Sequence, residues 1–136
     1  MSHIPLFSRK LVIKRADNRC EYCQLSQKGQ EATFHVDHIV PIASGGETIA
    51  ENLALACVSC SLRKGAKQFV NIEGEKDKVR LFDPRNDLWK DHFEWRGPML
   101  FGKTNTGVAS VQSLDLNRRL MVSIREEEML LSRHHG

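Results

Sequence analysis

Two residues whose side chains can together hydrolyse a phosphate ester stand next to each other in the sequence, Asp37 and His38. A carboxylate is a hard oxygen ligand for Mg²⁺, and an imidazole can be neutral near pH 7 and accept a proton. Phosphodiester hydrolysis uses both, because a base takes the proton of the attacking water while a metal neutralises charge on the phosphate. The pair alone is a weak indication. In an ideal strand its side chains point to opposite faces, so both reach one site only if the chain twists or bends, as Pro41 permits.

The four cysteines form two pairs with the same spacing, Cys20-x-x-Cys23 and Cys57-x-x-Cys60. A two-residue spacer lets both sulfurs of a pair reach one ion, and two pairs can supply the four thiolates of a tetrahedral Zn²⁺ site. The alternatives are disulfides, which a reducing compartment disfavours, or a redox CxxC, which needs no second copy. We therefore predict a structural zinc site, with the Asp-His pair housed between its two halves.

The elements that position these residues must be short. Residues 33–40 are rich in β-branched and apolar side chains, which predicts a strand that stops at Pro41. A helix is expected just before the first cysteine pair, with Ser8 as its N-cap. The segments predicted around the cysteines are a helix at 8–18, a polar loop at 24–32, a turn at 44–46, a returning arm at 52–56 and a short basic helix at 61–68.

The chain changes character after residue 70, and we expect an organisation into a core at 1–70 and a C-terminal extension at 71–136 that packs on it. The extension is predicted to contain a charged surface connection at 71–78, a turn at 83–86, a hairpin at 92–103 folded at Gly97-Pro98, and a helix at 117–132. The helix places an apolar face opposite Arg118, Arg125 and Glu127, and this face is typical of a core or dimer contact. The apolar face consists of Leu120, Met121, Ile124 and Leu131.

Composition sets wide limits on function. The net charge is only +3, which permits nucleic-acid binding without demanding it. No apolar run reaches the roughly eighteen residues that a membrane span needs, and the first residues lack the uninterrupted apolar core of a signal peptide. We therefore expect a cytoplasmic protein without membrane contact. The sequence contains two basic clusters, and each can be interpreted as a solvated face or as a nucleic-acid contact. The first cluster consists of Arg9, Lys10, Lys14, Arg15 and Arg19, and the second of Arg63, Lys64 and Lys67.

The order of these motifs resembles the zinc-containing branch of the HNH endonuclease family. The matching residues are Cys20-x-x-Cys23, Asp37-His38-Ile39-Val40-Pro41, Gly45-Gly46, Glu51-Asn52-Leu53, Cys57-x-x-Cys60 and Arg63-Lys64-Gly65, in that order. The resemblance covers roughly a third of the chain, from Arg19 to Gly65. It implies an α+β fold with a ββα-metal core, in which two antiparallel strands and a helix grip one divalent cation. Zn²⁺ would occupy a separate, structural site.

The resemblance also implies roles for single residues. His38 would be the general base that activates water, and Asp37 a ligand of the catalytic Mg²⁺ or Mn²⁺. Asn52 would hold the loop and orient the histidine. The candidate contacts to nucleic acid are Arg63 and Lys64 on DNA phosphates, with Lys67 and His35.

One position departs from the family pattern. Ser61 stands where a His or Asn usually ligates the metal, and a neutral hydroxyl is a weaker ligand. It can bind through water, Asp91 or His92 can substitute for it, or catalysis can be slow or lost. His35 precedes Asp37 by two residues and would share its face of a strand, so it can approach the metal or the phosphate or remain an exposed strand residue.

The function expected from the sequence is metal-dependent hydrolysis of phosphodiester bonds in DNA, with double-stranded DNA as the substrate. The main alternative is a catalytically degenerate, zinc-stabilised module that binds nucleic acid or a partner protein. A third reading makes the C-terminal helix a docking face for a second copy of the chain or for a larger complex. That reading is compatible with either of the other two.

Overall fold

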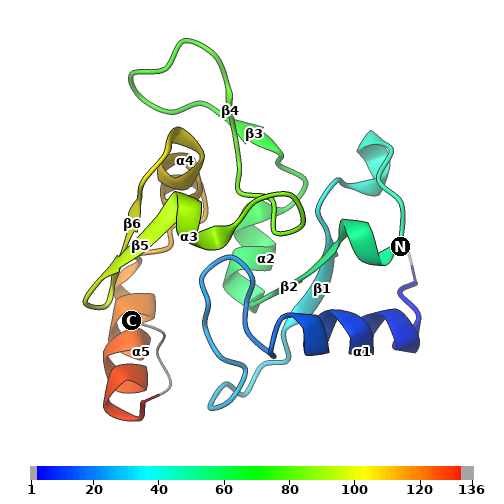
Figure 1. Cartoon of the computed structure of the whole chain (residues 1–136), viewed down its shortest axis with the longest axis horizontal. Coiled ribbons are helices and arrows are strands. Elements are labelled where there is room, and N and C mark those ends of the chain that lie inside the picture. Colours follow the sequence, from blue (N-terminus) through cyan, green and yellow to red (C-terminus); the bar gives the residue numbers. More distant parts are fainter. Residues whose placement is uncertain (1–2, 133–136) are drawn as a thin grey trace. The chain divides into compact units, whose positions relative to one another are not determined.

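A computed structural model describes residues 3–132 as short helices and small antiparallel sheets (Figure 1). The helices are α1 (Leu6–Arg15), α2 (Val58–Lys64), α3 (Trp89–His92), α4 (Asn105–Ser113) and α5 (Arg119–Leu130), with 3₁₀ turns η1 (Ile42–Ser44) and η2 (Ala50–Asn52). The strands are β1 (His35–His38), β2 (Leu53–Ala56), β3 (Phe69–Val70), β4 (Val79–Arg80), β5 (Phe93–Arg96) and β6 (Met99–Gly102). This mixture confirms the predicted α+β class.

Contacts divide the chain into two compact units. The first, which we call the cysteine unit, runs to Ala66 and takes up Asp83–Asn86 again further on. The second, the hairpin unit, contains Lys67–Phe82 and the residues from Asp87 onward. The expected boundary at residue 70, and the expected packing of the extension on the core, stay predictions.

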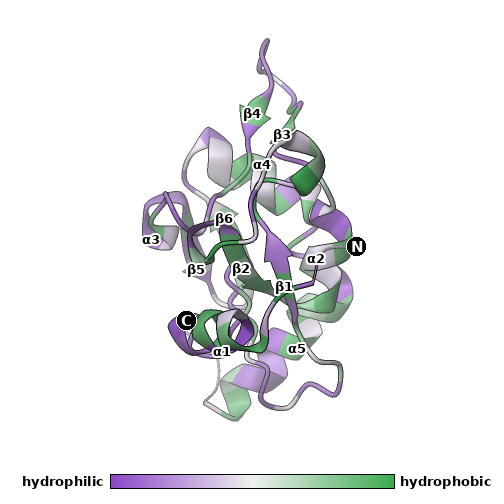
Figure 2. Cartoon of the chain, turned by 90° about the vertical axis from the view of Figure 1, so that its right-hand side faces the viewer, coloured by the Kyte–Doolittle hydropathy of each residue, from purple (hydrophilic) through white to green (hydrophobic). Residues whose placement is uncertain are grey.

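The centre of the cysteine unit is the antiparallel pair β1–β2, in which His35 lies opposite Ala56 and His38 opposite Leu53. All four residues of β2 are buried, and the strand is hydrophobic along its length (Figure 2). In β1, Val36 is buried beside the half-buried Asp37 and His38. The predicted strand is thus present, shortened to four residues. The polar side chains of β1 are therefore available for a functional site, whereas β2 contributes only to the hydrophobic core.

Helix α1 begins two residues before the predicted N-cap, so the prediction of Ser8 in that position is wrong. The residue before the first turn is Pro5, and no side chain caps the helix. Proline suits this place, because its fixed φ is compatible with a helix start and the amide hydrogen that it lacks would have no partner there. The chain then reverses through Asp17 and Asn18, both at φ +54°. Short polar side chains tolerate this left-handed conformation, which directs the chain into the first cysteine pair.

Helix α2 also lies earlier than predicted, at Val58–Lys64 instead of residues 61–68. The reason is the cysteine pair itself. Cys57 is the N-cap, and its sulfur accepts a hydrogen bond from the amide of Cys60. Gly65, at φ +51°, ends the helix in a conformation that favours glycine. The second cysteine of the pair therefore sits within the first turn of the helix.

The hairpin unit contains the predicted β5–β6 hairpin, in which Phe93 pairs with Gly102 and Arg96 with Met99. Two of its elements were not predicted. The charged connection at 71–78 lies between β3 and β4, which pair with each other. Helix α4 has β-branched residues and a glycine, so its helix propensity is low, but the Thr104 hydroxyl caps it by accepting a hydrogen bond from the amide of Gly107.

Helix α5 occupies the predicted region, but its buried face was predicted wrongly. Met121, Arg125 and Glu128 are buried, whereas Leu120 is 68% exposed. Arg125 is buried because its guanidinium donates hydrogen bonds to the carbonyl of Pro98 and to Asn117, each at 3.1 Å. Self-association through this helix stays a prediction. Within residues 3–132, no helix is both long and apolar enough to cross a membrane.

Candidate metal and catalytic centre

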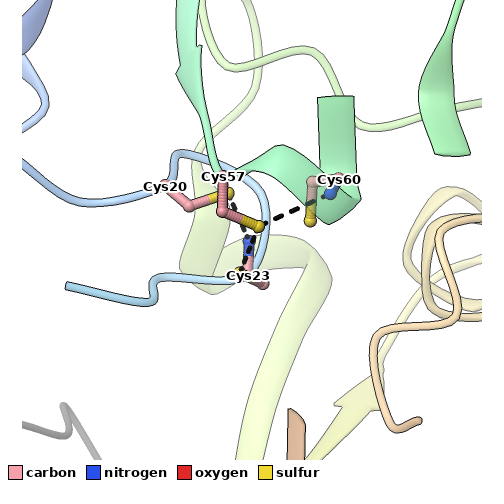
Figure 3. A group of neighbouring side chains, drawn as sticks. All are labelled: Cys20, Cys23, Cys57 and Cys60. Atoms are coloured by element: carbon pink, nitrogen blue, oxygen red, sulfur yellow. Dashed lines mark hydrogen bonds between the residues drawn. The ribbon is translucent and has the colours of Figure 1, made fainter. Parts of the chain in front are cut away.

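The four cysteine sulfurs converge at the end of β2, as predicted, and all four residues are buried (Figure 3). Their sulfur atoms lie within 4.8 Å of one another, and Cys23 Sγ is 3.7 Å from Cys57 Sγ. A tetrahedral Zn²⁺ with Zn–S bonds of about 2.3 Å separates its sulfurs by roughly 3.8 Å, whereas a disulfide requires about 2.05 Å. The spacing therefore fits one ion held by four thiolates, and no disulfide is formed.

Both cysteine pairs use the same local turn. The amide of Cys23 donates to Cys20 Sγ at 3.5 Å, and the amide of Cys60 donates to Cys57 Sγ at 3.4 Å. An N–H group aimed at a sulfur stabilises its thiolate form, because the donor's partial positive charge faces the developing negative charge. The turn thus both aligns two sulfurs with one point in space and favours the state that binds metal.

The pKa values of three of these thiols are shifted in different directions. Burial raises the pKa of Cys20 well above its ordinary value, and hydrogen bonding with Cys20 raises the pKa of Cys60. The pKa of Cys57 is lowered instead, because Cys20, Cys23 and Cys60 hydrogen-bond to its sulfur. Cys57 is therefore held readily as a thiolate, whereas Cys20 and Cys60 need a compensating positive charge to ionise. A soft divalent ion such as Zn²⁺ supplies that charge, and the donor set fits it.

A second centre lies at the other end of the β1–β2 pair, where a cavity of about 280 Å³ opens. Three residues that the sequence singled out, Asp37, His38 and Ser61, line it together. The remaining lining residues are Pro41, Ile42, Gly65 and Ala66. Because β1 ends at His38 and the chain turns at once, the two neighbouring side chains reach one cavity despite the alternation of a strand.

His38 makes one hydrogen bond that the sequence did not suggest. Its Nε2 lies 2.8 Å from the hydroxyl of Thr48, in the connection between β1 and β2. Thr48 has no motif around it, and a threonine in a loop gives no signal that could have identified it. The contact nevertheless fixes one ring nitrogen of the candidate base.

Asn52 closes the connection that carries Thr48. Its side-chain oxygen accepts from the amide of Val40 at 2.9 Å, and its side-chain nitrogen donates to the carbonyls of Val40 and Glu47 at 3.0 and 2.9 Å. The loop is tightly packed here, because a Cβ on Gly46 would lie 1.8 Å from the Val40 oxygen. Among the described residues, no hydrogen bond joins Asn52 directly to His38. Asn52 therefore acts on the loop, and any effect on the imidazole passes through the backbone.

His35 and Ser61 pair with each other across β1 and α2. His35 Nδ1 is 2.9 Å from the Ser61 hydroxyl, so a histidine stands beside the position where the family has a His or Asn. His35 is exposed and does not line the cavity. Asp91 and His92, the other candidate substitutes for Ser61, belong to the hairpin unit. His92 hydrogen-bonds there to Thr104.

The three basic residues that were predicted to contact DNA differ in exposure. Arg63 on α2 is exposed, and so is Lys67, which belongs to the hairpin unit. Lys64 is only 3% exposed, and its ammonium donates to the carbonyl of Ile39 at 3.1 Å. Burial lowers the pKa of Lys64, while the negative charges of Asp37 and Asp83 oppose that shift. The expectation of a phosphate contact from Lys64 is therefore corrected, because its charge points into the unit.

An ion pair that sequence spacing could not reveal holds the first cysteine pair against β2. One carboxylate oxygen of Glu21 pairs with Arg85, and the other accepts from the amide of Leu55 at 2.8 Å. The Glu21 amide in turn donates to the Leu55 carbonyl at 2.8 Å. Glu21 and Arg85 are 64 residues apart in the chain, so no local pattern links them.

Comparison with known proteins identifies the segment that carries both centres. Residues 20–67 match the family model of the HNH endonucleases, which confirms the resemblance seen in the sequence. This segment is therefore similar to the HNH endonucleases, and the similarity indicates a nuclease or a role in contact with nucleic acid. No curated protein and no solved structure matches the chain.

Proposed function

We propose that the protein is a metal-dependent endonuclease that hydrolyses phosphodiester bonds in double-stranded DNA. The observation that carries this proposal is the shared cavity of Asp37, His38 and Ser61 within the HNH segment. A carboxylate, an imidazole and a hydroxyl in one cavity are a suitable set for activating water beside a cation. A zinc-stabilised fold without enzymatic function has no need of this arrangement.

The residues present fit a hard divalent cation that keeps much of its own water. Asp37 and Ser61 offer oxygen atoms, which Mg²⁺ and Mn²⁺ prefer. In the part of the chain that the structure describes, only the cysteine cluster brings three or more His, Cys, Asp or Glu ligand groups together. A cation at Asp37 would therefore take its remaining ligands from water and from the phosphate, as Mg²⁺ usually does. When bound, it would neutralise charge on the phosphate and the departing oxygen.

His38 supplies the base. It stands next to the carboxylate in the chain and lines the same cavity, so a water molecule there can come within hydrogen-bonding reach of its ring. The imidazole takes a proton from that water as the oxygen attacks phosphorus. Asp37 would hold the cation, whose positive charge would keep the substrate phosphate next to the base. Double-stranded DNA is the substrate expected from the family match, and the exposed Arg63 on α2 offers a contact for a phosphate.

The test of the proposal is the cleavage of supercoiled plasmid with and without added Mg²⁺ or Mn²⁺. The wild type should nick the plasmid only with the added metal, and His38→Ala should slow cleavage by about 10²–10⁴-fold, because it removes a general base. Zinc content and the unfolding transition should not change. His3→Ala is the control, since His3 is exposed and outside the cavity. A His38→Ala variant that cleaves like the wild type would remove His38 from the mechanism.

The two neighbouring cations on α2 should separate DNA binding from stability. Arg63→Ala should weaken DNA binding in buffer without Mg²⁺ or Mn²⁺ and reduce the slope of log K against log [salt] by about 1, as for one lost phosphate contact. Lys64→Met should leave this slope unchanged but reduce the free energy of unfolding by about 1–3 kcal/mol, because the Ile39 carbonyl loses its donor. Salt titrations of fluorescent duplex DNA and denaturant melts measure both. Equal effects of the two substitutions on the salt slope would contradict this assignment.

Ser61 favours one second candidate function, a module that binds DNA without cutting it. A hydroxyl that is hydrogen-bonded to His35 is a weak substitute for a ligating His or Asn. On this reading the folded, zinc-loaded wild type would bind duplex DNA and cleave nothing with either metal. The plasmid assay decides between the two functions, because the first requires metal-dependent nicking that is lost in His38→Ala.

A further inference from the structure

We propose that Thr48 is a positioning residue that holds His38 in the tautomer with its proton on Nε2, which leaves Nδ1 to take the proton of water. The direction assigned to this hydrogen bond rests on the proposed function, whereas the distance between the two groups is independent of it. The Thr48 hydroxyl lies 2.8 Å from His38 Nε2, an ordinary hydrogen-bond distance. Thr48 and His38 are both half-buried, so the contact is partly protected from water.

The backbone on both sides of Thr48 is fixed by the same residue. Asn52 donates from its side chain to the carbonyl of Glu47 and from its backbone amide to the carbonyl of Ile49, each at 2.9 Å. Thr48 therefore sits between two carbonyls that Asn52 holds. A residue framed in this way presents its hydroxyl in a defined direction, which a loop residue without such anchors does not. The influence expected of Asn52 on the histidine thus reaches the ring through Thr48.

The direction of the hydrogen bond follows from the work required of the ring. A neutral imidazole carries a proton on one nitrogen and a lone pair on the other. Nε2 is engaged by Thr48, so the nitrogen left to accept a proton from water is Nδ1. Nδ1 has a lone pair only when Nε2 carries the hydrogen. His38 must then donate from Nε2 to the Thr48 oxygen, and this bond stabilises the productive tautomer.

The test compares Thr48→Val, which removes the hydroxyl, with Thr48→Ser, which keeps it. Ring ¹⁵N shifts of labelled histidine, recorded on the full zinc-loaded chain at a pH where the imidazoles are neutral, report the tautomer directly. The His38 signals are assigned by their absence in His38→Gln. Wild type and Thr48→Ser should show a single tautomer protonated at Nε2, and Thr48→Val a mixture. Thr33→Val is the matched control, because Thr33 is exposed and does not line the cavity.

Plasmid cleavage gives a second readout. Thr48→Val should lower kcat by about 10-fold or more with KM changed less than about 2-fold, and Thr48→Ser should restore most of the rate. Zinc content and the unfolding midpoint are measured for each variant, so that a general loss of structure is recognised. If Thr48→Val is too unstable, Thr48→Ala provides the variant without the hydroxyl, and a wild-type His38 protonated at Nδ1 overturns the proposal without any variant.

Two outcomes would overturn the proposal. One is a wild-type His38 protonated at Nδ1, and the other is the same tautomer in the wild type and in a folded Thr48→Val. Failure of the proposed function would look different. Wild type would then not cleave with any metal, while the dependence of the His38 tautomer on the Thr48 hydroxyl would still be seen or refuted by the spectra.

Discussion

Cys57→Ser should abolish both metal retention and cooperative folding of the cysteine unit. Cys57 belongs to the buried four-sulfur cluster and also caps α2, so the substitution removes a ligand and weakens the start of the helix. Structural Zn²⁺ sites contribute about 10–16 kcal/mol in zinc-finger peptides, which is as large as the entire stability of a typical domain, about 5–15 kcal/mol. Metal analysis of the purified protein and the hydrogen exchange of β1 and β2 amides measure the two losses.

The control uses the metal itself. Wild-type protein treated with a strong chelator should lose the protection of β1 and β2 and regain it when Zn²⁺ is added back, whereas Cys57→Ser should not recover. Co²⁺ added to the apo wild type should give the intense absorption of tetrahedral thiolate coordination. A Cys57→Ser protein with one equivalent of bound metal and unchanged exchange would show that the cluster does not hold the unit together.

Gly46→Ala should destabilise the cysteine unit by about 3 kcal/mol or more. The new Cβ would lie 1.8 Å from the oxygen and 2.6 Å from the carbonyl carbon of Val40, and 2.9 Å from the Asn52 side chain. Two of these atoms belong to the backbone and cannot rotate away, so the loop must move and the Asn52–Val40 hydrogen bonds must break. Catalysis should fall as well, because the same loop carries Thr48.

The neighbouring Gly45 provides the matched comparison. It has φ +91° and nothing within 4 Å of its would-be Cβ, so Gly45→Ala meets only backbone strain, of about 1 kcal/mol. Trp89 and Trp95 both lie in the hairpin unit, so their fluorescence follows that unit, while Co²⁺ absorption follows the cysteine unit. In denaturant titrations, the midpoint of the Co²⁺ signal should shift more for Gly46→Ala than for Gly45→Ala. The midpoint of the tryptophan signal should shift less than that of the Co²⁺ signal in Gly46→Ala. Equal shifts for the two glycines would contradict the role of close packing.

The sequence predicted those features whose physical cause is local. The spacing within each cysteine pair is set by one turn, so the convergence of four sulfurs could be expected from Cys20-x-x-Cys23 and Cys57-x-x-Cys60 alone. The short strand before Pro41 is encoded in β-branched side chains, and the hairpin at Gly97-Pro98 in its turn residues. The order of these motifs also sufficed to indicate the HNH family.

The sequence could not predict features that depend on distant partners. Lysine is almost always exposed, so Lys64 was expected at the surface, and only the folded chain brings the Ile39 carbonyl to its ammonium. Arg125 was likewise assigned to the polar side of α5, although carbonyls from other segments bury it. The Glu21–Arg85 pair and the Thr48–His38 contact each need a fold already formed.

Asp83–Asn86 belong to the cysteine unit although residues 67–82 before them belong to the hairpin unit. This arrangement limits which segments can be exchanged between proteins by recombination. A recombination event that joined residues 1–70 to a new partner would transfer every motif residue but leave Arg85 behind. Glu21 would then keep a half-buried carboxylate without its cation, next to the cysteines that it braces against β2. A functional transplant must therefore extend to residue 86, so it includes the start of the hairpin unit, which lies between the motif residues and Arg85 in the sequence.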